Sequence, residues 1–140
     1  MGNESYMGVK KVFLTWEDIN LLLDKINEQV VDNVRYVTGV PRGGTILAIL
    51  YSHRFEVEYM ERPSPHYPDM LVIDDIADSG VTLKEMSERF PMLMYATLHY
   101  KEGSIYKPRY YSEKINKDYG WIVYPWEKES ANPIQDYLDN

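Results

Sequence analysis

Apolar residues recur at helical spacing near the start of the chain. Thr15 is followed by Glu17 and Asp18, a combination typical of a helix N-terminus. The apolar residues after it repeat every three or four positions and are Ile19, Leu22, Leu23, Ile26 and Val30. This pattern predicts a first helix that packs one face against a large apolar surface.

Strand-like and helix-like segments then alternate along the chain. Strands are predicted at residues 34–40, 55–60, 71–73 and 92–99, and helices at residues 45–52 and 82–90. A glycine turn, Pro41-Arg42-Gly43-Gly44, follows the first strand, and a loop with three prolines spans residues 62–68. The alternation predicts an α/β fold, in which a mostly parallel, twisted sheet is flanked by helices.

The helical alternation stops after Tyr100. A stretch rich in Lys and Tyr follows, and then the aromatic segment 121–126. We expect residues 101–128 to form a small C-terminal hood folded over the sheet edge, beside a core at about residues 9–100. Because 140 residues suit one hydrophobic core, a single domain is predicted over residues 1–140.

Composition and charge restrict the classes of function. The hydrophobic fraction of 44% and the charged fraction of 26% are typical of a soluble globular chain. The net charge of −7 disfavours a nucleic-acid partner, since phosphate backbones require clustered Lys and Arg. Without cysteine, disulfides, thiolate zinc sites and a thiol nucleophile are excluded. No apolar run is long enough to span a membrane and no targeting segment is evident, so we expect a cytoplasmic protein without a membrane partner.

Residues 71–83 carry the most informative motif. An apolar strand runs into Asp74 and Asp75, Asp78 follows, and the turn Ser79-Gly80-Val81-Thr82 then opens a helix. Paired carboxylates can hold a hard cation or accept hydrogen bonds from vicinal hydroxyls. Ser, Gly and Thr at a helix N-terminus offer amides and hydroxyls to a phosphate. A sugar phosphate would satisfy both halves, whereas the alternative interpretation is an Asp-rich turn that only caps a helix.

This motif resembles the binding motif for 5-phosphoribosyl-1-diphosphate in type I phosphoribosyltransferases. The resemblance implies the fold of that family and Mg²⁺ as cofactor. It implies that Asp74 and Asp75 hold the ribose hydroxyls, directly or through the metal. Asp78 is implied as the general base beneath the purine. Asp78, Ser79, Gly80, Val81 and Thr82 are implied to grip the 5′-phosphate.

The glycine turn after the first strand has a second role in this resemblance. In an open parallel sheet both turns lie at the carboxyl ends of strands, where ligands bind. Glycines let the backbone approach an anion, and Arg42 offers a forked donor to phosphate oxygens. Taken alone, the turn is equally well an ordinary tight turn. Its spacing from the acidic motif matches the family's diphosphate loop, which implies diphosphate binding by Pro41, Arg42 and Gly43.

The segment after the last predicted strand resembles the base-recognition region of bacterial xanthine–guanine and hypoxanthine–guanine phosphoribosyltransferases. The resemblance implies that Lys101 contacts the 6-oxo group, that Trp121 stacks on the base and that Ile122 reads the exocyclic groups through its carbonyl. An indole suits a flat purine ring, although without the resemblance a core position at the sheet edge is the favoured interpretation of Trp121. Trp126 is interpreted as structural.

These resemblances predict a purine phosphoribosyltransferase of base salvage, which transfers the phosphoribosyl group to a 6-oxopurine, with a homodimer or homotetramer expected. Two alternatives remain open: a catalytically weak regulatory protein that binds phosphoribosyl diphosphate, and a transferase for a non-purine acceptor. The short loop at residues 61–69 departs from the family, whose active members usually carry a longer loop that closes over the sugar. The three histidines show no ligand-like spacing and are assigned neither to metal nor to catalysis.

Overall fold

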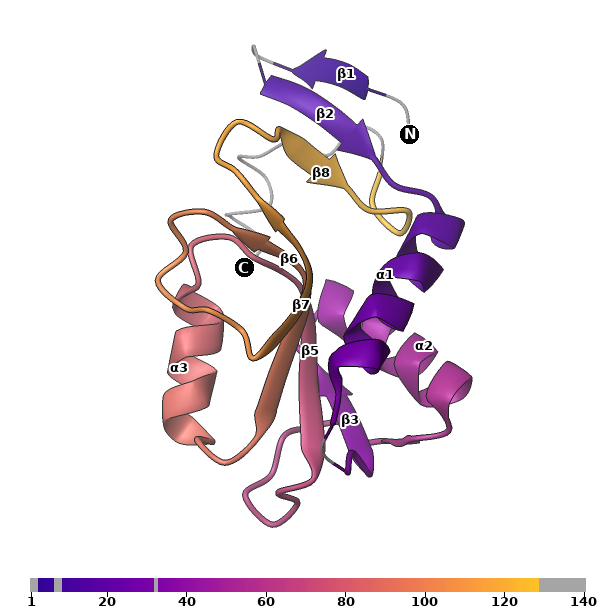
Figure 1. The fold of residues 1–140 in the computed structure, drawn as a ribbon, viewed down its shortest axis with the longest axis vertical. Coiled ribbons are helices and arrows are strands. Elements are labelled where there is room, and N and C mark those ends of the chain that lie inside the picture. Colours follow the sequence, from indigo (N-terminus) through magenta and orange to yellow (C-terminus); the bar gives the residue numbers. More distant parts are fainter. Residues whose placement is uncertain (1–2, 7–8, 32, 129–140) are drawn as a thin grey trace. The chain divides into compact units, whose positions relative to one another are not determined.

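The structure, a computed structural model, describes residues 3–6, 9–31 and 33–128 (Figure 1). The chain packs as two compact units. The larger comprises residues 22–115 and contains a five-stranded sheet, and the smaller comprises residues 1–21 with 116–140 and contains a three-stranded sheet. The single domain expected over residues 1–140 stays a prediction.

The five strands of the larger unit are all parallel, in the order β4-β3-β5-β6-β7. The strands are β3 (Tyr36–Gly39), β4 (Glu58–Tyr59), β5 (Met70–Ala77), β6 (Met94–Lys101) and β7 (Tyr110–Ile115). The crossover helices α2 (Gly43–Phe55) and α3 (Val81–Arg89) follow β3 and β5. The predicted parallel α/β architecture is therefore confirmed.

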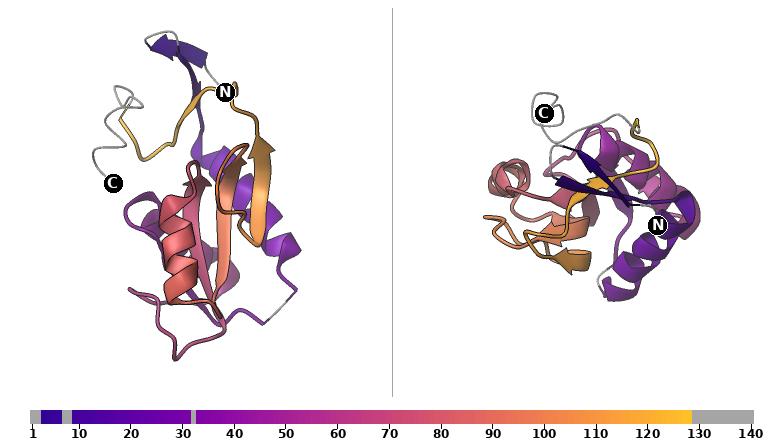
Figure 2. Two further views of the ribbon diagram at one scale, coloured as in Figure 1. Left: turned by 90° about the vertical axis from the view of Figure 1, so that its left-hand side faces the viewer. Right: turned by 90° about the horizontal axis from the view of Figure 1, so that it is seen from above.

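Helices cover both faces of this sheet (Figures 1 and 2). On the α3 face, Met70 and Val72 of β5, Tyr95 of β6 and Leu83 of α3 belong to one buried cluster. On the other face α2 packs against β3 and β5. The first four residues of β5 are all buried, as expected for a central parallel strand covered on both sides.

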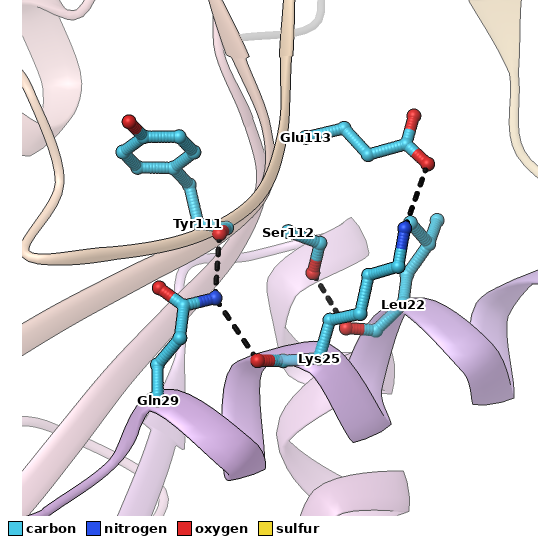
Figure 3. Close-up of polar contacts among 6 residues, drawn as sticks. All are labelled: Leu22, Lys25, Gln29, Tyr111, Ser112 and Glu113. Atoms are coloured by element: carbon cyan, nitrogen blue, oxygen red, sulfur yellow. Dashed lines mark hydrogen bonds and ion pairs between the residues drawn. The ribbon is translucent and has the colours of Figure 1, made fainter.

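The C-terminal half of α1 (Trp16–Gln29) contacts β7, an edge strand of the main sheet, through hydrogen bonds and an ion pair (Figure 3). The Gln29 amide nitrogen donates to the carbonyl of Tyr111 at 2.7 Å and to that of Lys25 at 2.9 Å. The Ser112 hydroxyl donates to the Leu22 carbonyl at 2.5 Å, and Lys25 pairs with Glu113 at 3.3 Å. An edge strand presents unpaired backbone groups, and here a helix occupies part of that edge.

Three predicted elements differ in the structure. The strand expected at residues 55–60 is limited to β4, because α2 continues to Phe55 and ends where Glu56 adopts a left-handed conformation with φ of 55°. The acidic strand extends beyond residue 73 to Ala77. The expected hood at residues 101–128 was wrong for β7, which belongs to the main sheet.

The smaller unit contains two strands that the sequence analysis did not predict. These are β1 (Asn3–Tyr6) and β2 (Val9–Phe13), and β2 also pairs in parallel with β8 (Trp121–Val123). The predicted start of α1 is confirmed by a reciprocal cap, in which the Thr15 amide donates to Asp18 at 2.8 Å and the Asp18 amide donates to the Thr15 hydroxyl at 3.1 Å. Among the described residues no helix has the length and apolar character needed to cross a bilayer.

Candidate active site

The turn from β3 to α2 folds tightly back on itself. A Cβ on Gly39 would meet the backbone of Gly44 and would lie 2.5 Å from the Thr45 nitrogen, so only glycine fits there. The peptide bond between Pro41 and Arg42 is cis. Pro41 and Arg42 are exposed, and Gly43 begins α2. The turn therefore presents its backbone and Arg42 to solvent at the carboxyl end of β3.

The acidic pair lies where the side-chain alternation of β5 reverses. Met70, Val72 and Ala77 all belong to the α3-face cluster, although strict alternation would place Ala77 on the opposite face. Across this reversal the Asp75 amide donates to Asp74 Oδ1 and the Ile76 amide donates to Asp75 Oδ1, both at 2.8 Å. Each carboxylate is therefore held close to its own backbone at the carboxyl end of the strand.

The turn at residues 79–82, which we call the phosphate turn after the ligand that the sequence predicts for it, leads into α3. Gly80 is the N-cap residue with φ of 85°, a conformation that favours glycine. The Val81 amide lies 3.4 Å from the Ser79 hydroxyl, whereas Val81 and Thr82 are exposed. The first amides of a helix carry a partial positive charge and suit an anion. The local geometry expected from the sequence, a strand, an acidic pair and a glycine turn onto a helix, is present.

The β3–α2 turn meets the neighbouring strand β5 at the acidic pair. The Val40 amide donates to the Ile73 carbonyl at 2.9 Å. A Cβ on Gly44 would meet the Ile73 carbonyl and would lie 3.2 Å from Asp74 Oδ1. The sequence analysis did not include Gly44 among the site residues, although the Gly43-Gly44 pair was the signal for such a close approach. Because Gly44 has no side chain, the β3–α2 turn can lie directly against the acidic pair.

Lys101, the last residue of β6, adds a side chain from a third strand to the site. Its ammonium nitrogen lies 3.3 Å from Asp78 Oδ1, and both side chains are about one quarter exposed, at 26% and 29%. An ion pair with this much exposure contributes little to folding. The pair matters for ligand binding, because it places a hydrogen-bond donor and a carboxylate side by side at the carboxyl ends of β5 and β6.

The two remaining predicted residues, Trp121 and Ile122, lie on β8 in the smaller unit, in register with Lys11 and Val12. Ile122 is buried and Trp121 is half-buried. The Trp121 indole N–H is buried and has no hydrogen-bond partner among the described residues. The ring of Trp126 stacks on Tyr124, with centroids 5.0 Å apart, and contacts Trp16, which supports its interpretation as structural.

The 61–69 loop lies at the opposite end of the main sheet from the β3–α2 turn and the phosphate turn (Figure 1). The Asp69 carbonyl accepts the Arg35 amide at 3.0 Å, and the Tyr67 ring packs on Tyr36 with centroids 4.8 Å apart. Both contacts lie at the amino end of β3. In this structure the loop does not reach the carboxyl ends of β3, β5 and β6, so it does not close over the site residues there.

The carboxylates of the acidic pair suit a metal ion that is bound jointly by the protein and the substrate. Among the residues that the structure describes, no group of three or more His, Asp or Glu side chains is arranged to hold an ion. Asp74 and Asp75 supply hard oxygen donors, and Mg²⁺ is usually held by one or two carboxylates together with substrate oxygens and water. The residues present fit Mg²⁺ in that shared arrangement.

Proteins similar to this chain in sequence or in fold include several phosphoribosyltransferases. No family model matches the chain. A xanthine-guanine phosphoribosyltransferase from Nitratidesulfovibrio vulgaris is 23% identical, over 86% of this chain and 87% of its own. A purine phosphoribosyltransferase from Pyrococcus horikoshii superposes with a TM-score of 0.72 at 23% identity, over 87% of this chain and 97% of its own. The chain has the type I phosphoribosyltransferase fold.

A second solved structure extends this likeness. The xanthine-guanine-hypoxanthine phosphoribosyltransferase from Helicobacter pylori has a TM-score of 0.68 at 20% identity and covers 94% of this chain and 99% of its own. The resemblance to type I phosphoribosyltransferases and, among them, to the purine enzymes is therefore confirmed. In the phosphoribosyltransferase fold of this chain, the two turns described above follow the carboxyl ends of β3 and β5, and Lys101 lies at the carboxyl end of β6.

Proposed function

We propose that this protein is a Mg²⁺-dependent phosphoribosyltransferase that transfers the phosphoribosyl group of 5-phosphoribosyl-1-diphosphate to a 6-oxopurine, giving a nucleoside monophosphate and diphosphate. The observation that carries the proposal is the convergence of two turns and one ion pair on adjacent strands. The Gly39–Gly44 turn contacts Asp74, and Asp78 of the next turn pairs with Lys101. Similarity to xanthine-guanine phosphoribosyltransferases over most of the chain supports it.

The sugar diphosphate would lie across the two turns. The phosphate turn receives the 5′-phosphate through helix N-terminal amides and hydroxyls, and Pro41, Arg42 and Gly43 receive the diphosphate. Asp74 and Asp75 accept hydrogen bonds from the ribose hydroxyls and hold Mg²⁺. The metal supplies charge neutralisation for the departing diphosphate.

The chemical step exchanges one bond at ribose carbon 1. A purine ring nitrogen forms the new bond as the bond to diphosphate breaks, so positive charge develops on the sugar. The nearby carboxylates of Asp74 and Asp75 favour that charge. Asp78 accepts the proton that the purine ring loses, as a general base. Excess positive charge on the base is thereby removed during bond formation.

The Asp78–Lys101 pair supports a 6-oxopurine as the acceptor. On such a base the carbonyl oxygen and N7 share one edge. Lys101 donates to the carbonyl, and Asp78 accepts from a protonated N7 beside it. A 6-aminopurine would present an amino donor to the ammonium donor, and a site built for a hydrogen bond rejects an analogue that cannot make it. Trp121 and Ile122 remain the predicted stacking and carbonyl contacts.

A panel of acceptors tests this proposal. The protein is incubated with Mg²⁺, the sugar diphosphate and one base at a time: guanine, xanthine, hypoxanthine, adenine, uracil or orotate. Nucleotide and released diphosphate are then quantified. We expect product with at least one 6-oxopurine, and kcat/KM for adenine lower by about 10²-fold or more. Product with only a pyrimidine would instead support the non-purine transferase.

One observation favours a second function, a regulatory protein that binds phosphoribosyl diphosphate. The 61–69 loop is anchored at the far end of the sheet, whereas loop closure usually excludes water from such reactions. Tight binding of the sugar diphosphate without product for any base would support this second function.

Size-exclusion chromatography with light scattering tests the predicted homodimer or homotetramer in the same preparation.

A further inference from the structure

The connection between β6 and β7 lies directly against the phosphate turn. The Ser79 carbonyl accepts the Ile105 amide at 2.9 Å. A Cβ on Gly80 would meet the Ser104 hydroxyl and would lie 2.7 Å from the Tyr106 nitrogen. Together with the Asp78–Lys101 pair, these contacts hold three consecutive residues of the β5–α3 turn against one segment.

This segment, residues 101–106, is itself well supported. The Ser104 amide donates to the Lys101 carbonyl at 3.0 Å, and its hydroxyl donates to the Tyr106 carbonyl at 2.8 Å. The Tyr106 ring packs edge-on against Tyr95, with centroids 6.0 Å apart. The Tyr95 hydroxyl in turn donates to the carbonyl of Met86 in α3 at 3.0 Å and to that of its C-cap residue Phe90 at 2.8 Å. The segment is therefore fixed to the core that supports the same helix.

The Ile105 contact decides where one amide of the phosphate turn points. The Ser79–Gly80 peptide bond is trans, since the cis bond in the described chain is Pro41–Arg42. In a trans peptide the C=O and N–H directions are opposite. A Ser79 carbonyl held towards Ile105 therefore turns the N–H of Gly80, a buried residue, away from residues 101–106.

We propose that Ile105 is a positioning residue, whose backbone amide fixes the Ser79–Gly80 peptide so that the Gly80 N–H is preorganised to bind the 5′-phosphate of the ligand. This inference rests on the proposed function. Ile105 is 59% exposed, so its role depends on the amide and not on core packing. A donor fixed before binding avoids the entropy loss of ordering it afterwards.

Two substitutions at position 105 separate the amide from the side chain. Ile105→Pro removes the donor, whereas Ile105→Ala keeps it and serves as the matched control. Calorimetry measures the Kd of two ligands, ribose 5-phosphate and inorganic diphosphate with Mg²⁺. In the proposed function ribose 5-phosphate binds at the phosphate turn, and diphosphate binds at the β3–α2 turn. We expect Ile105→Pro to weaken ribose 5-phosphate about tenfold and to leave diphosphate within about twofold. Ile105→Ala should leave both within about twofold.

Steady-state kinetics give a second readout. In Ile105→Pro the KM for phosphoribosyl diphosphate should rise about tenfold while kcat changes less than about twofold, because the lost contact is made in both ground and transition states. Equal weakening of ribose 5-phosphate and diphosphate would show general disruption and overturn the inference. Unchanged binding of ribose 5-phosphate in Ile105→Pro would also overturn it, with the proposed function unaffected.

A measurement on the unaltered protein covers the case in which Ile105→Pro does not fold. Titration with ribose 5-phosphate should shift the NMR amide resonance of Gly80, whereas the Ile105 amide should stay slow to exchange with solvent throughout. A Gly80 resonance that does not move, or fast exchange at Ile105, would overturn the inference. Absence of nucleotide formation with every base would instead count against the proposed function alone, because both measurements here follow binding.

Discussion

At the scale of single residues, the Asp78 carboxylate belongs to the acidic motif and also forms an ion pair with Lys101 at 3.3 Å. Asp78→Asn keeps the shape of the side chain but removes its capacity to accept a proton. We expect kcat to fall by about 10²-fold or more, with the KM for the sugar diphosphate changed less than about threefold. The fold should persist, since a partly exposed ion pair contributes at most about 1 kcal/mol.

A matched control for Asp78→Asn is Glu85→Gln, which removes one carboxylate from the exposed surface of α3. This variant should retain wild-type kcat, which separates loss of the base from loss of one negative charge. Both variants are compared by steady-state kinetics with the preferred base. An unchanged kcat in Asp78→Asn would remove the general-base assignment and leave the binding roles of Asp74 and Asp75 intact.

His99 gives a second prediction at the residue scale. It is 1% exposed on β6, and burial, with a smaller contribution from Lys25, lowers its pKa from 6.5 to about 4, against the opposing effect of Glu113. Between these two pKa values the unfolded chain binds a proton that the folded chain does not. Stability from this group is therefore complete above pH 6.5 and falls by about 3 kcal/mol as the pH decreases to 4.

Urea unfolding at pH 7.0, 5.5 and 4.5 checks the His99 prediction. Other groups also titrate over this range, so the comparison is between the wild type and His99→Gln. The free energy of unfolding of the variant should decrease less over the range, by up to about 3 kcal/mol. The exposed histidine variant His66→Gln is the control and should follow the wild-type profile. Parallel profiles for wild type and His99→Gln would contradict the assignment.

At the scale of elements, the contact between α1 and β7 in Figure 3 protects the edge of the main sheet. Gln29→Ala removes a donor that serves the carbonyls of Tyr111 and Lys25. We expect a loss of about 1 kcal/mol in the free energy of unfolding, measured in urea at pH 7. Its neighbour Glu28 is exposed, so Glu28→Ala should stay within about 0.5 kcal/mol. Equal effects of the two substitutions would show that the edge contact contributes nothing.

The elements that the sequence predicted well are those determined by neighbouring residues. The cap at Thr15 and Asp18 is local, and the start of α3 after Gly80 follows from one glycine turn. β7 was not predicted, because its mixed polar pattern becomes a strand only when β6 pairs with one side and Gln29 of α1 contacts the other. Element boundaries therefore failed where distant partners decide them.

The candidate site follows the same distinction. Its carboxylates and phosphate turn lie within one short motif, so their order was readable from the sequence. The contact of Gly44 with Asp74 and the ion pair of Lys101 with Asp78 join segments far apart in the chain. Spacing along the sequence contains no direct information on such contacts. The hydrogen bond between Ile105 and Ser79 was invisible for the further reason that any residue except proline can donate it.

At the scale of the whole molecule, charge opposes the proposed ligand. The chain has a net charge of −7, and the site residues include three carboxylates, Asp74, Asp75 and Asp78, against two cations, Arg42 and Lys101. A sugar carrying a phosphate and a diphosphate is itself strongly anionic. Helix N-terminal amides offset part of this repulsion, but each contributes only a partial charge. Binding should therefore require the divalent cation in addition to the protein's own donors.

Ligand-linked stability measures this requirement without turnover. With Mg²⁺ and phosphoribosyl diphosphate at one hundred times its Kd, the free energy of unfolding should increase by about 2.7 kcal/mol. The same ligand concentration in EDTA should give less than about 1 kcal/mol, even when NaCl matches the ionic strength, because screening does not replace coordination. The double variant Asp74→Asn with Asp75→Asn should lose the difference between the two conditions. Full stabilisation in EDTA would instead mean that the protein binds the anion through Arg42, Lys101 and the turn amides alone, and the acidic pair would then act on the ribose hydroxyls without a metal.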